Sequence, residues 1–338
     1  MRVVSLLFAL SLIPALAAET DPAGYRTLSM PAPHHGRMLE GAIWYPTDEP
    51  GDEVVIAGNA VFHGVTVSEN APMADGQHPL VMLSHGLGGH VRSLAWLAAG
   101  LAERGAIVIA VNHPNSTWGD FDLEAMLEHW TRVQDLSLVL DKTLADSDFA
   151  QHVDPQRIMA AGFSYGGWTA LSMGGLRSNQ EGFTTYCREH RARSAVCQDL
   201  ARAGINVGAL SAETWAASYA DDRITHVAAI DPALTWGLNA GHASDLVGHV
   251  TLIGLGKGDD RLAGTDFDAS GFAGLLPDAD ILRLAPASHF SALSLCKPGA
   301  EAILEAEGDD PVCTDPDGTD RAGVHAAIID RLAADLDL

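Results

Sequence analysis

The chain has 338 residues, with 44 Asp and Glu against 20 Lys and Arg, so its formal net charge at pH 7 is −24. The acidic residues are scattered, and an acidic surface of this kind repels nucleic acid and anionic membranes. Hydrophobic residues make up 47% of the chain, which is enough for a sizeable core. The composition therefore excludes a nucleic-acid-binding protein and predicts a globular one.

The first residues are typical of a secretory signal. Residues 1–17 carry one Arg, then a mostly apolar run at 3–13, and then small residues suited to cleavage. The apolar run is too short to cross a bilayer as a helix. We therefore predict a signal peptide at residues 1–17 and an exported mature protein, periplasmic or extracellular, without a stable membrane anchor.

The first half of the chain shows apolar runs of strand length and stretches of helical spacing. Strands are predicted at residues 36–45, 53–61, 79–84 and 106–111. Helices are predicted at residues 93–104 and 121–144. Residues 60–77 are polar and rich in turn formers, so they are expected to form a surface loop.

The strand at 79–84 runs directly into the glycine-rich turn His85-Gly86-Leu87-Gly88-Gly89-His90, and a predicted helix follows. Strand, turn and helix in this order make half of a βαβ unit. The glycines allow backbone N–H groups to approach a ligand closely. A phosphate-binding loop is the alternative, but the G-x-G-x-x-G spacing is not met.

Three polar residues that follow this unit, His113, Arg132 and Asp135, are interpreted as structural. His113 follows the strand at 106–111, and a loop histidine there is more often a hydrogen-bonding residue than a direct participant in a site. Arg132 and Asp135 lie three residues apart in the predicted helix, close enough to pair.

The most informative stretch is residues 157–175. A strand at 158–161 ends in Gly162-Phe163-Ser164-Tyr165-Gly166-Gly167, and a helix follows at 168–173. An abrupt strand-to-helix turn crowds the atoms beside its apex, and the glycines at 162 and 166 remove the side chains that would collide. The helix that begins at Tyr165 directs its N–H groups at any oxyanion formed there. We interpret Ser164 as a nucleophile; a tight structural turn is the alternative.

Residues 176–222 depart from strand and helix alternation. This stretch is polar, contains helix-like pieces at 199–203 and 212–219, and is predicted to form a lid over the site. Trp215 and Tyr219 either line the pocket or pack internally. Beyond the lid, strands are predicted at residues 224–230, 250–255 and 281–284, and Asp320 caps a closing helix at 321–336. The simplest organisation is one domain over 18–338 with an insertion at about 176–222.

Four cysteines in an exported chain favour disulfides over a metal site. Cys187 with Cys197 and Cys296 with Cys313 are the pairings that need only local loop closure, although three connectivities are formally open. No C-x-x-C spacing occurs, so zinc is not expected. The acidic turn at 315–320 could offer oxygens to calcium, but its loop pattern is incomplete and a solvated helix entry is the favoured interpretation.

The ends of the predicted strands supply a serine, then aspartates, then a histidine. This order, Ser164 followed by an acid and His289, is that of the α/β-hydrolases. A serine hydroxyl needs a base, and His289 follows the last strand, where a loop can bring its imidazole over the nucleophile. For the acid we favour Asp231, with Asp259 and then Asp260 as alternatives.

The segments that begin at His78 (HPLVMLSHGLGGH), GFSYGG, AAIDPALTW and ASHFSALSLC together resemble platelet-activating factor acetylhydrolase and the dienelactone-hydrolase-like secreted esterases. The resemblance implies an α/β-hydrolase fold with a mostly parallel central sheet flanked by helices, and ester hydrolysis through an acyl-enzyme without a cofactor. It also implies Asp231 as the acid and the backbone N–H groups of Leu87 and Tyr165 as the oxyanion hole.

The sequence leaves two other functions open. A serine peptidase or amidase could use the same triad, and a secreted binding protein could keep the fold without activity. The expected partner is a small-molecule or lipid ester; the oligomeric state is not predicted.

Overall fold

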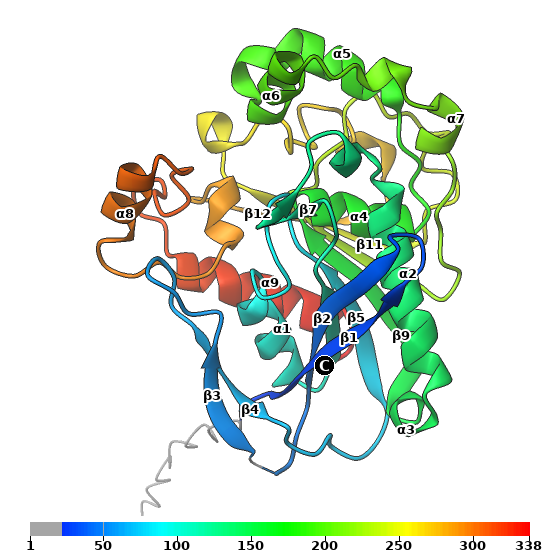
Figure 1. Ribbon diagram of the computed structural model, residues 1–338, viewed down its shortest axis with the longest axis vertical. Helices are drawn as coiled ribbons and strands as arrows, with labels where there is room; N and C mark the ends of the chain where they lie inside the picture. Colours follow the sequence, from blue (N-terminus) through cyan, green and yellow to red (C-terminus); the bar gives the residue numbers. More distant parts are fainter. Residues whose placement is uncertain (1–21, 50) are drawn as a thin grey trace, which may run out of the picture.

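The computed structural model of the chain describes residues 22–49 and 51–338 and contains one large twisted sheet (Figure 1). The signal peptide predicted at residues 1–17 lies outside the described residues. The sheet has ten strands: β1 (Gly24–Ala32), β2 (Arg37–Tyr45), β3 (Asp52–Ile56), β4 (Val65–Glu69), β5 (His78–Ser84), β6 (Ile107–Val111), β9 (Val153–Phe163), β10 (His226–Ile230), β11 (His249–Leu255) and β12 (Asp280–Leu284). A separate short hairpin joins β7 (Ser116–Thr117) to β8 (Asp120–Phe121).

The strand order is β12-β11-β10-β9-β5-β6-β2-β1-β4-β3. The strands from β12 to β6 are all parallel, and β2 then pairs antiparallel with both β6 and β1. Met82 of β5 lies opposite Ala160 of β9, and Phe163 of β9 lies opposite Ile230 of β10. The loops that follow β5, β9 and β10 therefore meet at one edge of the sheet, as the ends of parallel strands must.

Helices cover both faces of the sheet (Figure 1). They are α1 (Ala95–Ala102), α2 (Trp130–Ala145), α3 (Ser147–Ala150), α4 (Tyr165–Met173), α5 (Gln180–His190), α6 (Ala195–Ala203), α7 (Ala212–Trp215), α8 (Ala300–Glu307) and α9 (Arg321–Asp335). Alternate side chains of β5 enter different cores: Val81 and Leu83 pack with α1 and α9, and Leu80 and Met82 pack with α2 and α4. A strand buried on both faces has the almost continuous apolar sequence seen at residues 79–83.

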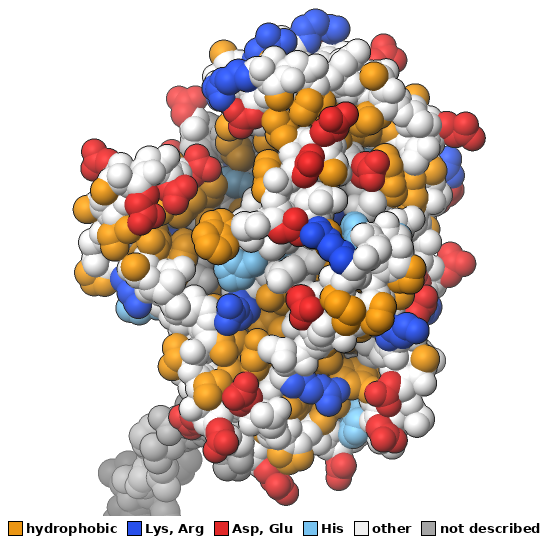
Figure 2. Space-filling model, in the orientation of Figure 1, with side chains coloured by type: hydrophobic (Ala, Val, Ile, Leu, Met, Phe, Trp, Pro, Cys, Tyr) orange, Lys and Arg blue, Asp and Glu red, His pale blue; other side chains and the backbone are white. Residues whose placement is uncertain are grey.

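The predicted lid region contains three helices, α5, α6 and α7, which we call the cap helices. Leu200 and Trp215 of this region form a small core of their own with Met126 and Leu127, which lie just before α2. Trp215 is therefore an internal packing residue. Figure 2 shows Lys and Arg side chains gathered over α5 and α6, whereas acidic side chains are spread across the rest of this face.

Two disulfides brace the chain. Cys187 of α5 is bonded to Cys197 of α6, so two of the three cap helices are joined covalently. Cys296, which precedes α8, is bonded to Cys313, which follows it. Among the helices at residues 22–49 and 51–338, none combines the length and the apolar character that a membrane span requires.

Several expected elements differ in the structure. The strand at 53–61 ends at Ile56, and the stretch 60–77 is not only loop, because it contains β4. The helix expected from 121 begins at Trp130, because Asp122 accepts hydrogen bonds from the N–H groups of Glu124 and Ala125 and so starts a short 3₁₀ turn instead. Strand β1 and helices α5 and α8 were not predicted.

Candidate active site

The turn between β9 and α4 holds Ser164 at its apex. The backbone of Ser164 has φ 58° and ψ −117°, a strained conformation that presents the side chain outward. A Cβ atom at Gly162 would overlap the carbonyl oxygen of Gly166, and a Cβ at Gly166 would overlap that of Ser84. The two glycines are therefore required by backbone that crosses directly beside them, which explains the G-x-S-x-G spacing.

Ser164, His289 and Asp231 form one line of hydrogen bonds. The Oγ of Ser164 lies 3.1 Å from Nε2 of His289, and Nδ1 of His289 lies 2.8 Å from Oδ2 of Asp231. The carboxylate of Asp231 is fully buried, and the imidazole of His289 packs against the ring of Phe163 with 4.5 Å between centroids. The three residues come from the loops after β9, β10 and β12.

The Asp231 carboxylate is held from several sides. Its Oδ1 accepts the N–H of Leu255 at 3.0 Å, and its Oδ2 accepts the hydroxyl of Thr265 at 3.0 Å. The guanidinium of Arg261 is also buried and lies 3.6 Å from Oδ1. These donors provide both carboxylate oxygens with partners in a place that is closed to solvent.

Thr265 and Arg261 were not found from the sequence. They belong to the loop after β11, the same turn in which the sequence analysis placed the alternative acids Asp259 and Asp260. In the structure both aspartates are exposed on a short 3₁₀ turn, and neither contacts His289 in the described part of the chain. The loop thus supplies partners for Asp231 and does not bring a competing carboxylate to the histidine.

The glycine-rich turn after β5 lies against the nucleophile. A Cβ at Gly86 would sit 3.3 Å from Cβ of Ser164, so the next peptide, with the N–H of Leu87, borders the serine. No described residue accepts that N–H. Tyr165 is the first residue of α4, and first-turn N–H groups have no acceptor within their own helix. Both predicted oxyanion donors are thus beside Ser164.

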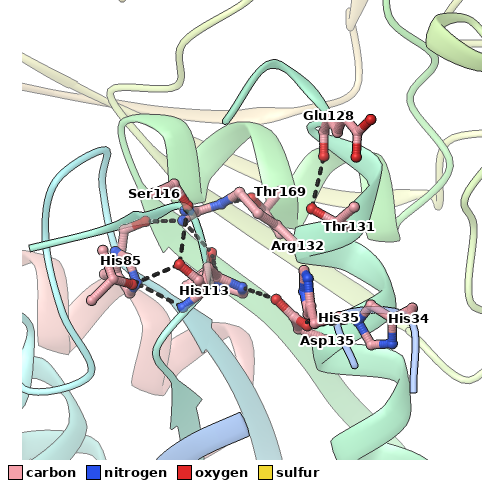
Figure 3. Close-up of polar contacts among 12 residues, drawn as sticks. His34, His35, His85, His113, Ser116, Glu128, Thr131, Arg132, Asp135 and Thr169 are labelled. Atoms are coloured by element: carbon pink, nitrogen blue, oxygen red, sulfur yellow. Dashed lines mark hydrogen bonds and ion pairs between the residues drawn. The ribbon is translucent and has the colours of Figure 1, made fainter. Parts of the chain in front are cut away.

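Beneath this turn lies the buried guanidinium of Arg132 (Figure 3). It donates to Thr169 Oγ1 at 3.0 Å, to Ser116 Oγ at 2.6 Å and to Ser84 Oγ at 3.1 Å, and also to the carbonyl oxygen of His85. Burial lowers the pKa of Arg132 to about 10, so the guanidinium remains charged at neutral pH. A fixed positive charge therefore sits directly below the end of the strand that precedes the turn at residues 85–90. We call this the oxyanion turn, because it carries the predicted oxyanion donor Leu87.

The expected pairing of Arg132 with Asp135 is wrong. The two side chains of α2 point to different partners, and a chain of hydrogen bonds through Ser84 and His113 links them. Nε2 of His113 accepts the Ser84 hydroxyl at 2.9 Å, and Nδ1 of His113 donates to Oδ2 of Asp135 at 2.9 Å. Burial lowers the pKa of His113 to about 4, so this imidazole is neutral at neutral pH. His113 is accordingly a buried structural residue.

Two other groups of polar residues lie outside the serine site. Asp315 of the acidic turn at 315–320 accepts the Ser291 hydroxyl at 2.6 Å and pairs with Arg321, and Asp320 caps α9, so both carboxylates already have structural partners. His34 and His35 converge with Asp135 and have the donor atoms of a metal site. No metal site was predicted from the sequence, and this histidine pair was not singled out there.

A mostly parallel sheet with helices on both faces, and a serine on a strained turn after its central strand, define the α/β-hydrolase fold. A solved ferulic acid esterase from Streptomyces cinnamoneus has the same fold, with a TM-score of 0.58 and 20% identity over 96% of this chain and 91% of that one.

The resemblance stated from the sequence is confirmed by a family match. The family model described as platelet-activating factor acetylhydrolase, isoform II, matches residues 55–118, which include the oxyanion turn. Lipase 1 of Moraxella sp. (strain TA144) is 35% identical over 86 residues, which are 25% of this chain and 24% of that protein. The chain has the α/β-hydrolase fold and resembles the platelet-activating factor acetylhydrolases, and it spans about a quarter of the curated relative it matches.

Proposed function

We propose that the protein is a carboxylic ester hydrolase that uses Ser164 as nucleophile, His289 as base and Asp231 as the carboxylate that orients the histidine. The observation that supports this best is the continuous line of contacts, 3.1 Å from Ser164 to His289 and 2.8 Å from His289 to Asp231. A serine hydroxyl becomes a useful nucleophile only when an oriented base can take its proton.

The reaction follows from the positions of these groups. Nε2 of His289 takes the proton of Ser164 as Oγ attacks the ester carbonyl, and the N–H groups of Leu87 and Tyr165 stabilise the oxyanion. Nε2 then returns the proton to the leaving alcohol, and an acyl-enzyme remains. Water, deprotonated by the same nitrogen, releases the acid and restores the serine. Asp231 holds the Nδ1–H tautomer and stabilises the imidazolium.

The substrate class follows from the relatives and from the surface beside the site. The similar proteins are named as an acetylhydrolase, a lipase and an esterase. Trp118 and Phe121 are exposed on the hairpin next to the oxyanion turn and offer an apolar surface to an acyl or alcohol group. The substrate is accordingly a small-molecule or lipid ester, and the chemistry requires no cofactor.

Location follows from the covalent structure. Disulfides persist in oxidising compartments, and all four cysteines of this chain are paired in disulfides. We place the working protein outside the cytoplasm, in agreement with the signal peptide predicted at residues 1–17. Edman sequencing of the exported protein would locate the new N-terminus.

Ester hydrolysis is tested with p-nitrophenyl esters of increasing acyl length, beside matched peptide anilides. Wild-type protein is expected to cleave the esters, and Ser164→Ala to lose at least about a thousandfold in kcat. A fluorophosphonate probe should label the wild type and not this variant.

Three results would contradict the proposal. Full ester hydrolysis by Ser164→Ala would remove the serine from the mechanism. Preferential cleavage of anilides would favour the peptidase or amidase. A folded wild-type protein that neither hydrolyses esters nor takes up the probe would favour a binding protein.

A further inference from the structure

Two adjacent histidines and one aspartate converge at a point away from Ser164. His34 and His35 lie in the turn between β1 and β2, and Asp135 lies on α2, about a hundred residues later (Figure 3). Nε2 of His34 is 2.8 Å and Nε2 of His35 is 2.9 Å from the same carboxylate oxygen, Oδ1 of Asp135. All three atoms lie within 4.8 Å of one another.

The local backbone produces this convergence. The N–H of His35 donates to the carbonyl of Ala32, and the N–H of Gly36 donates to that of Pro33, so two overlapping turns reverse the chain here. Gly36 has φ 65°, a conformation that suits glycine. As a result, neighbouring side chains that would diverge in a strand point the same way.

The carboxylate is arranged as a metal ligand would be. Asp135 is fully buried, and its second oxygen, Oδ2, is already held by the Nδ1–H of His113. An outer partner of this kind orients a ligating carboxylate and leaves the other oxygen for the metal.

The imidazoles can also present lone pairs. Metal binding through Nε2 requires the proton on Nδ1. Within residues 22–49 and 51–338, no hydrogen bond occupies Nδ1 of His34 or of His35. Each ring can therefore carry its proton on Nδ1 and leave the lone pair of Nε2 for a metal ion. The His35 side chain is 6% exposed and that of His34 22% exposed, which leaves a path from solvent.

We propose that His34, His35 and Asp135 bind one divalent transition-metal ion, with Zn²⁺ as the first candidate. Two imidazole nitrogens and one carboxylate oxygen suit zinc, which takes such ligands at about 2.0–2.2 Å and completes its shell with water. The ligand atoms of a tetrahedral site with such bonds lie about 3.3 Å from one another. Each Nε2 therefore has to move away from Oδ1 of Asp135 by only a few tenths of an ångström.

The ion would act as a structural clamp. It would tie the β1–β2 turn to α2 and fix Asp135, and through His113 also Ser84, whose carbonyl oxygen borders Gly166 of the serine turn. The proposal concerns a second site and does not depend on the hydrolase function. Its readouts are metal content and stability, and neither of them requires activity.

The test uses the mature chain without an affinity tag, stripped with EDTA and dialysed. Titration calorimetry and elemental analysis with Zn²⁺ are expected to give one equivalent for the wild type. The double variant His34→Gln/His35→Gln is expected to bind at least about 100-fold more weakly. Glutamine keeps an N–H donor near the position of Nε2 but is a poor zinc ligand, so the hydrogen bonds to Asp135 survive while the metal site does not.

A matched control is a second close histidine pair, His226 and His249, whose rings stack at 4.8 Å. Neither of these rings is hydrogen-bonded to a described carboxylate. His226→Gln/His249→Gln should therefore keep the wild-type stoichiometry and affinity. Zinc should also raise the Tm of the wild type and of this control, and leave the Tm of His34→Gln/His35→Gln unchanged.

The wild type gives a further reading that needs no variant. Co²⁺ added to the stripped protein should show the intense visible bands of a four- or five-coordinate ion, and Zn²⁺ should displace it. The proposal is overturned if the stripped wild type takes up no more Zn²⁺ than His34→Gln/His35→Gln. It is also overturned if Co²⁺ keeps the weak spectrum of the aqueous ion.

Discussion

Arg132 on α2 donates a hydrogen bond to the carbonyl oxygen of His85, the residue that precedes the turn facing Ser164. The guanidinium is fully buried, yet in the described residues it pairs with no carboxylate and its partners are hydroxyl and carbonyl oxygens. Burying an unpaired charge in this way is costly. A buried arginine can still be useful, because the planar fork of its guanidinium donates hydrogen bonds that hold several groups in position at once. We infer that Arg132 is a positioning residue for the oxyanion turn.

Replacing Arg132 tests this role. Arg132→Met fills a similar volume without donors, and we expect a fall of about 100-fold in kcat with little change in KM, because a misplaced oxyanion donor acts on the transition state. Arg132→Lys, which keeps the charge, should recover part of the loss. Steady-state kinetics on a p-nitrophenyl ester measures both. A folded Arg132→Met protein with wild-type kcat would show that the residue only supports packing.

The choice of acid gives a second prediction. Asp231→Asn keeps the shape but loses the charge that orients the histidine, so kcat should fall by about a thousandfold or more. Asp259→Asn and Asp260→Asn are matched controls on the exposed turn and should keep wild-type kinetics. If Asp259→Asn or Asp260→Asn caused the large loss instead, the assignment of Asp231 would have to be withdrawn.

The exposed hairpin leads to a prediction on substrate selection. The Trp118 side chain is 78% exposed, whereas its backbone N–H donates to the carbonyl of Gly89 at 2.8 Å, and the carbonyl of Ser116 accepts the backbone N–H of Gly88 at 2.9 Å. The backbone of the hairpin is thus anchored to the oxyanion turn, while the indole of Trp118 is uncovered. An exposed aromatic side chain next to a candidate site often marks a surface for an apolar ligand.

We therefore expect Trp118→Ala to raise KM about tenfold for long-chain esters and much less for acetate, with kcat maintained. A series of p-nitrophenyl esters measures this dependence on acyl length. Val55→Ala is the control, because Val55 is another exposed apolar residue, 69% accessible, on the edge strand β3. Equal KM values for Trp118→Ala and wild type at every acyl length would rule out a role in binding.

Local patterns accounted for the central part of the fold. Buried strands such as β5 and β6 are apolar on both faces, and the glycines around Ser164 are required by steric crowding within a few residues, so both features are readable from short stretches. Strand β4 escaped prediction because it is short and half exposed, and its pairing partners β1 and β3 define it more than its own sequence does.

The surroundings of the candidate site were harder to predict, because they depend on contacts between distant segments. Thr265 reaches Asp231 across 34 residues, and His34 reaches Asp135 across 101. Arg132 and Asp135 were expected to pair because they are three apart on one helix, but each finds a better partner in another element. Helical spacing brings two side chains together only when neither is taken by the tertiary structure.

The buried histidines give a prediction on stability. His129 is almost fully buried, its Nε2 faces the carbonyl of Trp215 at 3.0 Å, and its Nδ1 has no partner among the described residues. Burial lowers the pKa of His129 to about 4, because protonation would bury a charge and a second N–H without an acceptor. The unfolded chain titrates near the ordinary value of 6.5.

Between these two pKa values the unfolded chain binds a proton that the folded chain does not, so the free energy of unfolding falls as the pH falls from about 6.5 to about 4. Above pH 6.5 the full contribution of His129 to the free energy of unfolding is present, and about 3 kcal/mol of it is lost as the pH falls to about 4. His129→Gln retains a donor for Trp215 but cannot titrate, and it should flatten this part of the pH dependence by a similar amount. Urea unfolding at a series of pH values measures the slope. His63→Gln, at an exposed histidine, is the control and should leave the pH dependence of the free energy of unfolding unchanged. If His129→Gln also left it unchanged, His129 would not be the residue that resists protonation.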